Sequence, residues 1–289
     1  MLKQEIKILI LGATGMLGSA LLRYFFSKKC FIVYGTARSY KSAQGISDEI
    51  IKKIYFDVDL GDLKALQKVL NDIKPNVVVN CIGVIKQLPT AEDALVSIPL
   101  NSLLPHQLAS LCAAFGSRLI HFSTDCVFSG KKGGYFESDT PDATDLYGRS
   151  KLLGEVDYPN ALTIRTSIIG HELNGARSLV NWFLEQEGSI RGFTKAIFSG
   201  LPTVEVARVI EEYILSHSEL HGVYQLSVDP ISKHDLLSIV KDVYNKKIEI
   251  IPDDSLVIDR SLDSTRLRQA TGFIPKPWPE LVQAMHDFG

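Results

Sequence analysis

Cysteine is scarce in this chain of 289 residues, and its four cysteines show no CxxC spacing. Zinc sites and redox-active dithiols need thiols at short, defined spacing, so the sequence indicates neither, and we expect no metal site. In a reducing compartment, the four side chains are expected to be small, buried and not joined by disulfides. They are Cys30, Cys81, Cys112 and Cys126.

Long apolar runs are also missing. No run reaches the roughly 18 residues that a membrane-spanning helix needs. The short apolar stretch near the start of the chain is followed at once by Gly12 and Thr14, with no small-residue cleavage site. We therefore predict a strand that enters a turn and not a signal peptide, and we expect a cytoplasmic protein with no membrane partner.

Neither sign of charge dominates the chain, which has 31 basic and 33 acidic residues and a formal net charge of −2. A nucleic-acid partner would favour a basic excess, so none is expected. Hydrophobic residues make up 45% and charged residues 22% of the chain. That balance is typical of a globular protein and argues against a mostly disordered chain.

Strand-like and helix-like segments alternate through the first half. Apolar runs predict strands at 6–11, 31–36, 53–57, 77–81, 118–123 and 161–166. Helical spacing of apolar residues predicts helices at 18–26, 63–73 and 101–115. Because the strands are apolar throughout and do not alternate, we expect them to be buried on both faces. This order predicts an α/β fold with a doubly wound parallel sheet, of the Rossmann type.

The second half is less regular. Its pattern predicts short helices at 179–186 and 203–216 and a strand at 223–226, and five prolines lie in the final sixty residues. That density of proline fits short elements joined by fixed turns. We predict a nucleotide-binding domain over 1–166, to which the chain returns at about 200–228. A smaller substrate-binding lobe is predicted over 167–199 and 229–289.

The first predicted strand runs into a glycine-rich turn, LGATGMLGSALL, and then into a helix. A tight turn, a backbone that approaches a pyrophosphate and a helix packed closely on a strand each favour residues without a Cβ. The first NH groups of the helix can bind the phosphates. Dinucleotide binding is therefore predicted for Gly12, Thr14, Gly15, Met16, Leu17 and Gly18. The GxxGxxG spacing resembles that of the extended short-chain dehydrogenase/reductase superfamily.

The end of the second predicted strand favours NADP over NAD. A carboxylate there would bind the ribose hydroxyls of NAD, but the segment 35–41 contains no acid. Arg38 can instead form charge-assisted bonds to a 2′-phosphate and stack on adenine. We therefore predict that the cofactor is NADP(H).

Two further segments lie at the carboxyl ends of predicted strands, where ligands bind in open α/β sheets. In the resembling superfamily, the position of Asp57 and Val58 contacts the adenine ring. A role for Asp57 in a turn or helix cap stays open. Small residues after the fourth strand let the cofactor pass, and here these are Cys81, Ile82 and Gly83.

Tyr147 and Lys151 form a YxxxK pair, which places both side chains on one face of a helix. Tyrosine has a pKa of about 10 and is a poor acid at neutral pH, but a nearby ammonium favours the phenolate and lowers that pKa. The tyrosine can then give a proton to an alkoxide as hydride reaches the carbon. A hydroxyl from Thr124 could hold the carbonyl oxygen beside it. These three residues are the predicted catalytic triad.

Several segments together resemble the dTDP-4-dehydrorhamnose reductase family of extended short-chain dehydrogenases/reductases. STDCVFSG at 123–130 resembles the family's STDYVFDG, and YGRSKLLGE at 147–155 resembles its YGxSKxxGE. The segments 165–167, 201–207 and 264–278 match further motifs of the family. The resemblance covers almost the whole chain.

The resemblance implies NADPH-dependent reduction of the 4-keto group of a nucleotide-linked 6-deoxy sugar, as in dTDP-rhamnose biosynthesis. It also implies that Lys151 binds the nicotinamide ribose. A small-molecule nucleotide sugar is thus the expected partner, and a homodimer stays open. The candidates for substrate binding are Lys86, Thr124, Asp125 and, for the pyrophosphate, Arg165, Arg177 and Arg260.

Two departures from the family change the expected substrate wall. Ile168 and Ile169 follow the RTS segment, where the family often has Trp. Lys86 and Gln87 lie in a loop that differs from the family's NCAAYTxVDxAE.

Two alternatives stay open. An epimerase or dehydratase of the same superfamily would need a second acid–base pair, for which Cys126, Lys86 and His121 remain candidates. A non-catalytic regulatory subunit would bind NADP without turnover, and the intact triad weighs against it.

Overall fold

The computed structural model describes residues 5–59, 61–86 and 88–289 and divides into two compact units. The first unit runs through Ser123 and resumes at Asp145–Ile164 and Glu219–Val223. The second comprises Thr124–Thr144, Arg165–Ser218 and Tyr224–Gly289. In the division predicted from the sequence, segments of the two domains also alternate along the chain, and that division stays a prediction. Gln87, expected in the substrate wall, lies outside the described residues.

A seven-stranded sheet forms the scaffold, in the order β11-β6-β5-β4-β1-β2-β3. Its members are β1 (Ile6–Leu11), β2 (Phe31–Thr36), β3 (Ile54–Tyr55), β4 (Val77–Asn80), β5 (Arg118–Thr124), β6 (Ala161–Thr166) and β11 (Gly222–Gln225). The pairs β3–β2, β2–β1, β1–β4 and β4–β5 are parallel. The order of the strands reverses between β1 and β4, and ligands bind at such switch points. The predicted α/β fold with a parallel sheet is confirmed.

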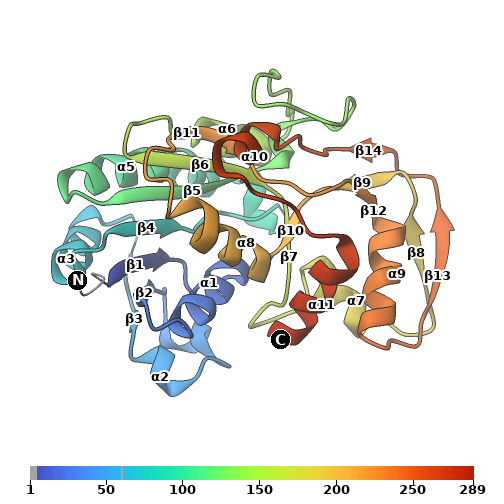
Figure 1. Cartoon of the computed structure of the whole chain (residues 1–289), viewed down its shortest axis with the longest axis horizontal. Helices are drawn as coiled ribbons and strands as arrows, with labels where there is room; N and C mark the ends of the chain where they lie inside the picture. Colours follow the sequence, from blue (N-terminus) through green and yellow to red (C-terminus); the bar gives the residue numbers. More distant parts are fainter. Residues whose placement is uncertain (1–4, 60, 87) are drawn as a thin grey trace. The chain divides into compact units, whose positions relative to one another are not determined.

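Helices of the first unit flank these strands (Figure 1). They are α1 (Met16–Phe26), α2 (Asp48–Ile51), α3 (Leu63–Ile73), α4 (Ala94–Ser97), α5 (Leu104–Ala114) and α6 (Leu146–Leu153), with short 3₁₀ turns η1 (Tyr40–Ala43) and η2 (Pro89–Glu92). Leu66 and Leu70 of α3 and Leu108 of α5 share one buried cluster with Leu9 and Val78 of the sheet. Their burial stabilises the fold by removing apolar surface from water. The helix predicted at 63–73 is therefore confirmed, with the expected apolar stripe facing the core.

The helix predicted over 101–115 is wrong at its start. A π-helical segment, η3 (Ile98–Leu103), precedes α5. The buried side chain of Asn101 explains its place, because its Oδ1 accepts a hydrogen bond from the Val84 amide at 2.9 Å and its Nδ2 donates to Ser150 Oγ at 3.1 Å. A π-helical turn re-aims one side chain without ending the helix. The Asn101 amide therefore links the loop after β4 to α6.

The second unit contains short strands and helices. They are η4 (Asp125–Val127), β7 (Ile168–Ile169), α7 (Leu179–Glu185), β8 (Ser189–Phe193), β9 (Ala196–Phe198), β10 (Leu201–Pro202), α8 (Thr203–Val209), the π-helical η5 (Ile210–Ile214), β12 (Ile231–Ser232), α9 (Lys233–Val243), β13 (Glu249–Asp253), β14 (Ile258–Asp259), α10 (Thr265–Thr271) and α11 (Trp278–Phe288). β13 pairs in parallel with β8, and α9 packs on both (Figure 1). β9 pairs with β12 on one side and β14 on the other. No helix among the described residues is both long and apolar enough to span a bilayer.

Three smaller expectations are corrected. The strand predicted at 53–57 shrinks to the two residues of β3, because Asp57 has a φ of 56°, outside the extended region. The helix predicted over 203–216 changes from α to π geometry after Val209. Of the four cysteines expected to be buried, Cys112 is buried, Cys81 and Cys126 are half-buried, and Cys30 is exposed because it lies in the turn between α1 and β2. All four cysteines are free.

Gly154→Ala is expected to lower the free energy of unfolding by about 2 kcal/mol, because overpacking forces the backbone to shift. A Cβ at Gly154 would lie 1.9 Å from the carbonyl oxygen of Asn101. Gly15→Ala is the matched control, since its Cβ would approach no atom closer than 3.5 Å; its cost should stay below about 1 kcal/mol. Urea unfolding measures both. Equal losses would contradict the close contact between α6 and η3.

Candidate functional site

The glycine turn after β1 is fixed by close packing. Gly12 has a φ of 79°, which favours glycine, and the amide of Ala13 donates to the Thr36 carbonyl at 2.9 Å. A Cβ at Gly18 would lie 2.1 Å from the Gly12 oxygen, and a Cβ at Gly12 would lie 2.9 Å from Ile82 Cγ1. Two of the three glycines are therefore required by the fold itself.

Gly15 is different, because it is exposed and a Cβ there would meet only ordinary contacts. It precedes α1, whose first turn contains no acidic residue. The partial positive charge of the helix N-terminus is thus not compensated by a side chain of that turn. Thr14 and Met16 are partly exposed here, whereas Leu17 is buried, and its contact with a cofactor stays a prediction. The turn fits an anionic ligand such as a pyrophosphate.

The predicted adenine-side residues follow β2 and β3. Arg38 is exposed two residues beyond the end of β2, and Asp57 is exposed beyond β3. Val58 is buried in the core cluster with Leu66 and Leu70, so packing alone accounts for its apolar side chain. The contacts of Arg38, Asp57 and Val58 with a cofactor stay predictions.

The loop after β4 links the glycine turn to the predicted catalytic lysine. The Cys81 amide donates to the Leu11 carbonyl at 3.0 Å. A Cβ at Gly83 would lie 3.1 Å from Asn101 Oδ1 and 3.8 Å from Lys151 Nζ. The structure thus brings the predicted cofactor residues 81–83 beside Lys151, within the first unit.

Helix α6 presents Tyr147 and Lys151. Asp145 caps the helix, because its Oδ1 accepts a hydrogen bond from the Gly148 amide at 2.7 Å. Its Oδ2 accepts from Lys86 Nζ at 2.8 Å. Lys86, predicted to bind substrate, is therefore held against the helix that carries Tyr147, and its contact with substrate stays a prediction.

Lys151 is a buried ammonium. Its side chain is among the buried polar groups of the core, with 5% of its surface exposed, and Nζ donates to the Phe122 carbonyl at 2.6 Å. Burial lowers the pKa of Lys151 to about 8, while the carboxylate of Glu155 and the thiol of Cys81 act in the opposite direction. Lys151 therefore titrates close to neutral pH, which suits a group that must influence a neighbouring tyrosine.

A buried histidine lies next to this lysine. His121 is fully buried, and its Nδ1 lies 3.0 Å from Asn80 Nδ2. Since Asn80 Oδ1 accepts from the Ile82 amide, Asn80 Nδ2 is the donor and His121 Nδ1 the acceptor. Burial, then the charge of Lys151, lowers the pKa of His121 well below its ordinary value. The ring is therefore neutral, and a role for His121 in a second acid–base pair stays a prediction.

Thr124 is the first residue of the second unit, so its placement beside Tyr147 stays a prediction. Its Oγ1 accepts a hydrogen bond from the Cys126 amide at 3.1 Å and donates to Asp125 Oδ1 at 3.1 Å. Burial raises the pKa of Asp125, and the bond from Thr124 opposes that shift. The one proton of the Thr124 hydroxyl is therefore donated to Asp125. The hydroxyl must turn away from Asp125 before it can donate to a substrate oxygen.

Two of the three predicted pyrophosphate ligands meet at Phe128. The Arg165 guanidinium lies 5.3 Å from the centre of the Phe128 ring, and Arg260 Nε donates to the Phe128 carbonyl at 2.8 Å. Two guanidinium groups that contact the same residue are candidates for binding one anion. Arg177 lies instead in an exposed loop, where its amide donates to Glu172. The binding of substrate by Arg165, Arg177 and Arg260 stays a prediction.

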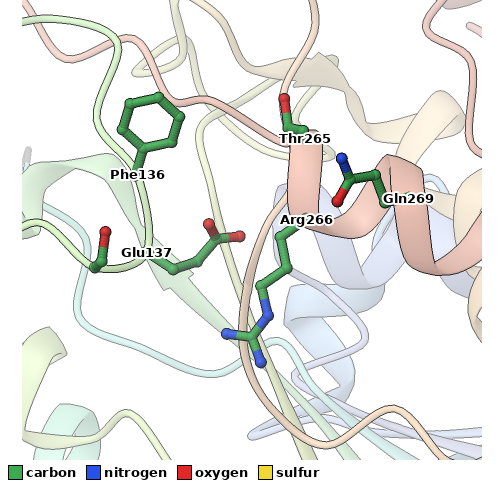
Figure 2. Close-up of a pocket in the computed structure, with 6 residues that line it drawn as sticks. Phe136, Glu137, Thr265, Arg266 and Gln269 are labelled. Carbon is green, nitrogen blue, oxygen red and sulfur yellow. The ribbon is translucent and has the colours of Figure 1, made fainter.

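The second unit also contains a pocket of about 440 Å³ (Figure 2). It lies between the segment 136–138 and the start of α10, and Glu137 and Arg266 extend into it from opposite sides. Glu137 Oε1 accepts from the Gln225 amide at 2.8 Å, and the Arg266 guanidinium stacks 4.2 Å above the centre of the Tyr224 ring. The sequence analysis did not identify these residues, because they match no spacing with a known mechanism.

The sequence analysis also missed Asn101 and Glu155. Asn101 is a polar residue of the predicted helix, but nothing near it in the sequence indicates which groups its amide will meet. Glu155 ends the YGRSKLLGE motif and lies four residues after Lys151, the spacing at which side chains meet on a helix. The described residues contain no cluster of metal-ligating side chains.

Comparison with known proteins gives a family. The model of the RmlD substrate binding domain matches residues 6–287. Among curated relatives, methionine adenosyltransferase 2 subunit beta of Danio rerio is 29% identical over 83% of this chain and 74% of its own length. The dTDP-4-dehydrorhamnose reductase of Aggregatibacter actinomycetemcomitans is 23% identical over 96% of this chain and 97% of its own.

Solved structures agree on the fold. The dTDP-4-dehydrorhamnose reductase of Bacillus anthracis, in complex with NADP, has a TM-score of 0.78 at 20% identity and covers 98% of this chain and 99% of its own. At this identity the likeness establishes the fold alone, which is that of the extended short-chain dehydrogenases/reductases.

The burial of Lys151 predicts a pH dependence of stability. Its folded-state pKa of about 8 lies below the ordinary 10.5, so between these values the unfolded chain holds a proton that the folded protein has released. The free energy of unfolding should therefore rise with pH in this window, relative to Lys151→Met, by about 3 kcal/mol. Urea unfolding from pH 7 to 10.5 measures the difference.

The matched control for this test is Lys64→Met, which removes an exposed ammonium from α3. Its curve should run parallel to that of the wild type. If the Lys151→Met curve is also parallel, the ammonium of Lys151 is not buried in solution.

Proposed function

Because this chain belongs to the RmlD substrate binding domain family, we propose that it reduces the 4-keto group of a nucleotide-linked 6-deoxy sugar with NADPH. The observation that carries the proposal is the buried ammonium of Lys151, four residues after Tyr147 on α6 and beside the loop that follows β4. A keto sugar needs a proton on its oxygen as hydride reaches its carbon. Tyr147 and Lys151 can supply that proton without a metal.

The role of each residue follows from its charge. The ammonium of Lys151 favours the phenolate of Tyr147, so the phenol is a better acid than free tyrosine. Lys151 is held by the Phe122 carbonyl and leaves Nζ protons for a ribose hydroxyl and for Tyr147. Thr124, once its hydroxyl turns from Asp125, would donate to the same substrate oxygen. Both donors stabilise the negative charge that develops there.

The first unit supplies the residues that would hold the cofactor. NADPH, when bound, supplies the hydride. Gly15 and the N-terminus of α1 would bind its pyrophosphate, and Lys151, which lies beside Gly83, would bind its ribose. Arg38 would bind the 2′-phosphate, which NAD lacks.

The second unit would bind the substrate. Arg165 and Arg260 both contact Phe128 and would bind a diphosphate, while Thr124 would donate to the substrate oxygen after its hydroxyl turns from Asp125. The absence of Trp at Ile168 removes a stacking surface for the sugar. The sugar is therefore expected to differ in shape from that of a rhamnose precursor.

The relatives also favour a second candidate function. Methionine adenosyltransferase 2 subunit beta, by its name, is a subunit of a larger enzyme. This chain could bind NADP and a catalytic subunit of that kind without turnover of a sugar. A stable complex on size-exclusion chromatography with methionine adenosyltransferase from the same cell, together with no turnover, would favour this function over the reductase.

Tyr147→Phe is expected to lower kcat by at least about 100-fold, because it removes the proton donor and keeps the ring. The measurement is NADPH oxidation with a panel of dTDP-, UDP- and GDP-linked 4-keto-6-deoxy sugars. Tyr158→Phe, which alters an exposed tyrosine of the same unit, should retain wild-type activity. Equal activity of both variants would exclude Tyr147 as the acid. Binding of NADPH with no turnover of any sugar would favour the epimerase, dehydratase or subunit instead.

Arg38→Asp is expected to weaken NADPH binding by about 10-fold or more and NADH binding far less, because only NADPH has a 2′-phosphate. Fluorescence titration with each cofactor measures the two affinities. Lys52→Asp makes the same change of charge at an exposed position after α2 and should alter neither affinity beyond a small, equal amount. An equal loss of both cofactors in Arg38→Asp would contradict the assignment.

A further inference from the structure

Two consecutive residues of β5 are joined to two residues of the α6 segment. Lys151 Nζ donates to the carbonyl of Phe122 at 2.6 Å, and Ser123 Oγ donates to Glu155 Oε1 at 2.7 Å. Glu155 lies one residue beyond Gly154, the cap of α6, and its amide still donates to the Leu152 carbonyl at 3.1 Å. The two bonds run in opposite directions, from helix to strand and from strand to helix. Together they fix the distance between the end of α6 and β5.

The charges around Lys151 single out Glu155. From the end of α6, the carboxylate of Glu155 acts on the ammonium. From the loop after β4 comes Cys81, whose pKa is raised by burial and whose influence on Lys151 is smaller than that of Glu155. From β5 comes His121, whose pKa is lowered well below neutral and whose ring carries no charge. Glu155 is thus the carboxylate that opposes the effect of burial on Lys151 among the described residues.

We propose that Glu155 is a positioning residue for the proposed reductase reaction: held by Ser123, it keeps Lys151 charged and aligned for Tyr147. Glu155 touches neither substrate nor cofactor in this proposal and acts through Lys151. Ser123 supplies orientation and Glu155 supplies charge, so the two contributions can be separated by mutation. The catalytic role of Glu155 rests on the proposed function, whereas its effect on the charge of Lys151 does not.

The test is a titration of Lys151 in protein labelled with 15N-lysine, with the Lys151 signal assigned from Lys151→Met. The wild-type midpoint is expected at about pH 8. In Glu155→Gln the midpoint should fall by roughly one pH unit, because the favourable carboxylate is lost. Ser123→Ala keeps the charge and loses the hydrogen bond, so it should shift the midpoint by less than half as much. Asp157→Asn, which removes an exposed carboxylate two residues further on, should leave the midpoint unchanged.

A Lys151 midpoint in Glu155→Gln equal to that of the wild type would overturn the proposal. Should Glu155→Gln not fold, Glu155→Asp keeps the charge, and its midpoint must stay closer to that of the wild type than the midpoint of Glu155→Ala. The titration needs no sugar, so its result does not depend on whether the protein reduces one. Where a sugar is turned over, the loss of kcat at high pH should move to lower pH in Glu155→Gln. A purely structural role would lower kcat equally at every pH.

Discussion

The candidate site depends on the burial of one positive charge. An ammonium inside a protein costs free energy unless polar groups replace the water that it loses. The Phe122 carbonyl takes one hydrogen bond from Lys151, and Glu155 supplies the opposite charge nearby. The end of β5 and the end of α6 must therefore stay at a fixed separation. The position of Tyr147 follows from the same restraint, because it shares the helix.

A second group, the buried amide of Asn101, connects this charge to the rest of the first unit. It binds Val84 in the loop after β4 and Ser150 next to Lys151. Gly154 brings the end of α6 against the Asn101 carbonyl, so the helix cannot slide along η3 without a clash. The cofactor loop and the catalytic helix are thus held by one side chain and one backbone contact.

The sequence predicted well whatever depends on local pattern. Apolar runs predicted the strands of the sheet, and helical spacing predicted α3 with its bounds at Leu63–Ile73. The glycine turn lies where β1 ends, and the YxxxK pair lies on helix α6, as their spacing predicted. The fold of the family agrees with that prediction, while the roles of the single residues stay predictions.

What the sequence could not give are features that depend on contacts distant in the chain. Asn101 was expected to begin a regular helix, because nothing nearby reveals that its amide will meet Val84 and Ser150. Glu155 lies in a known motif, yet its bond to Ser123 joins residues 32 positions apart. Cys30 is exposed because of the turn between α1 and β2, and the residue type alone does not predict whether a cysteine is buried.

The π-helical turn at η3 has a consequence for how related chains can differ in length. Such a turn holds one residue more than the α-helical turn that it replaces. Loss of a single residue between Ile98 and Leu103 would leave an unbroken helix. It would rotate the part of the helix before the deletion by about 100° relative to the part after it. Asn101 would then face away from Val84. Related chains should therefore accept insertions and deletions in surface loops far more readily than in η3.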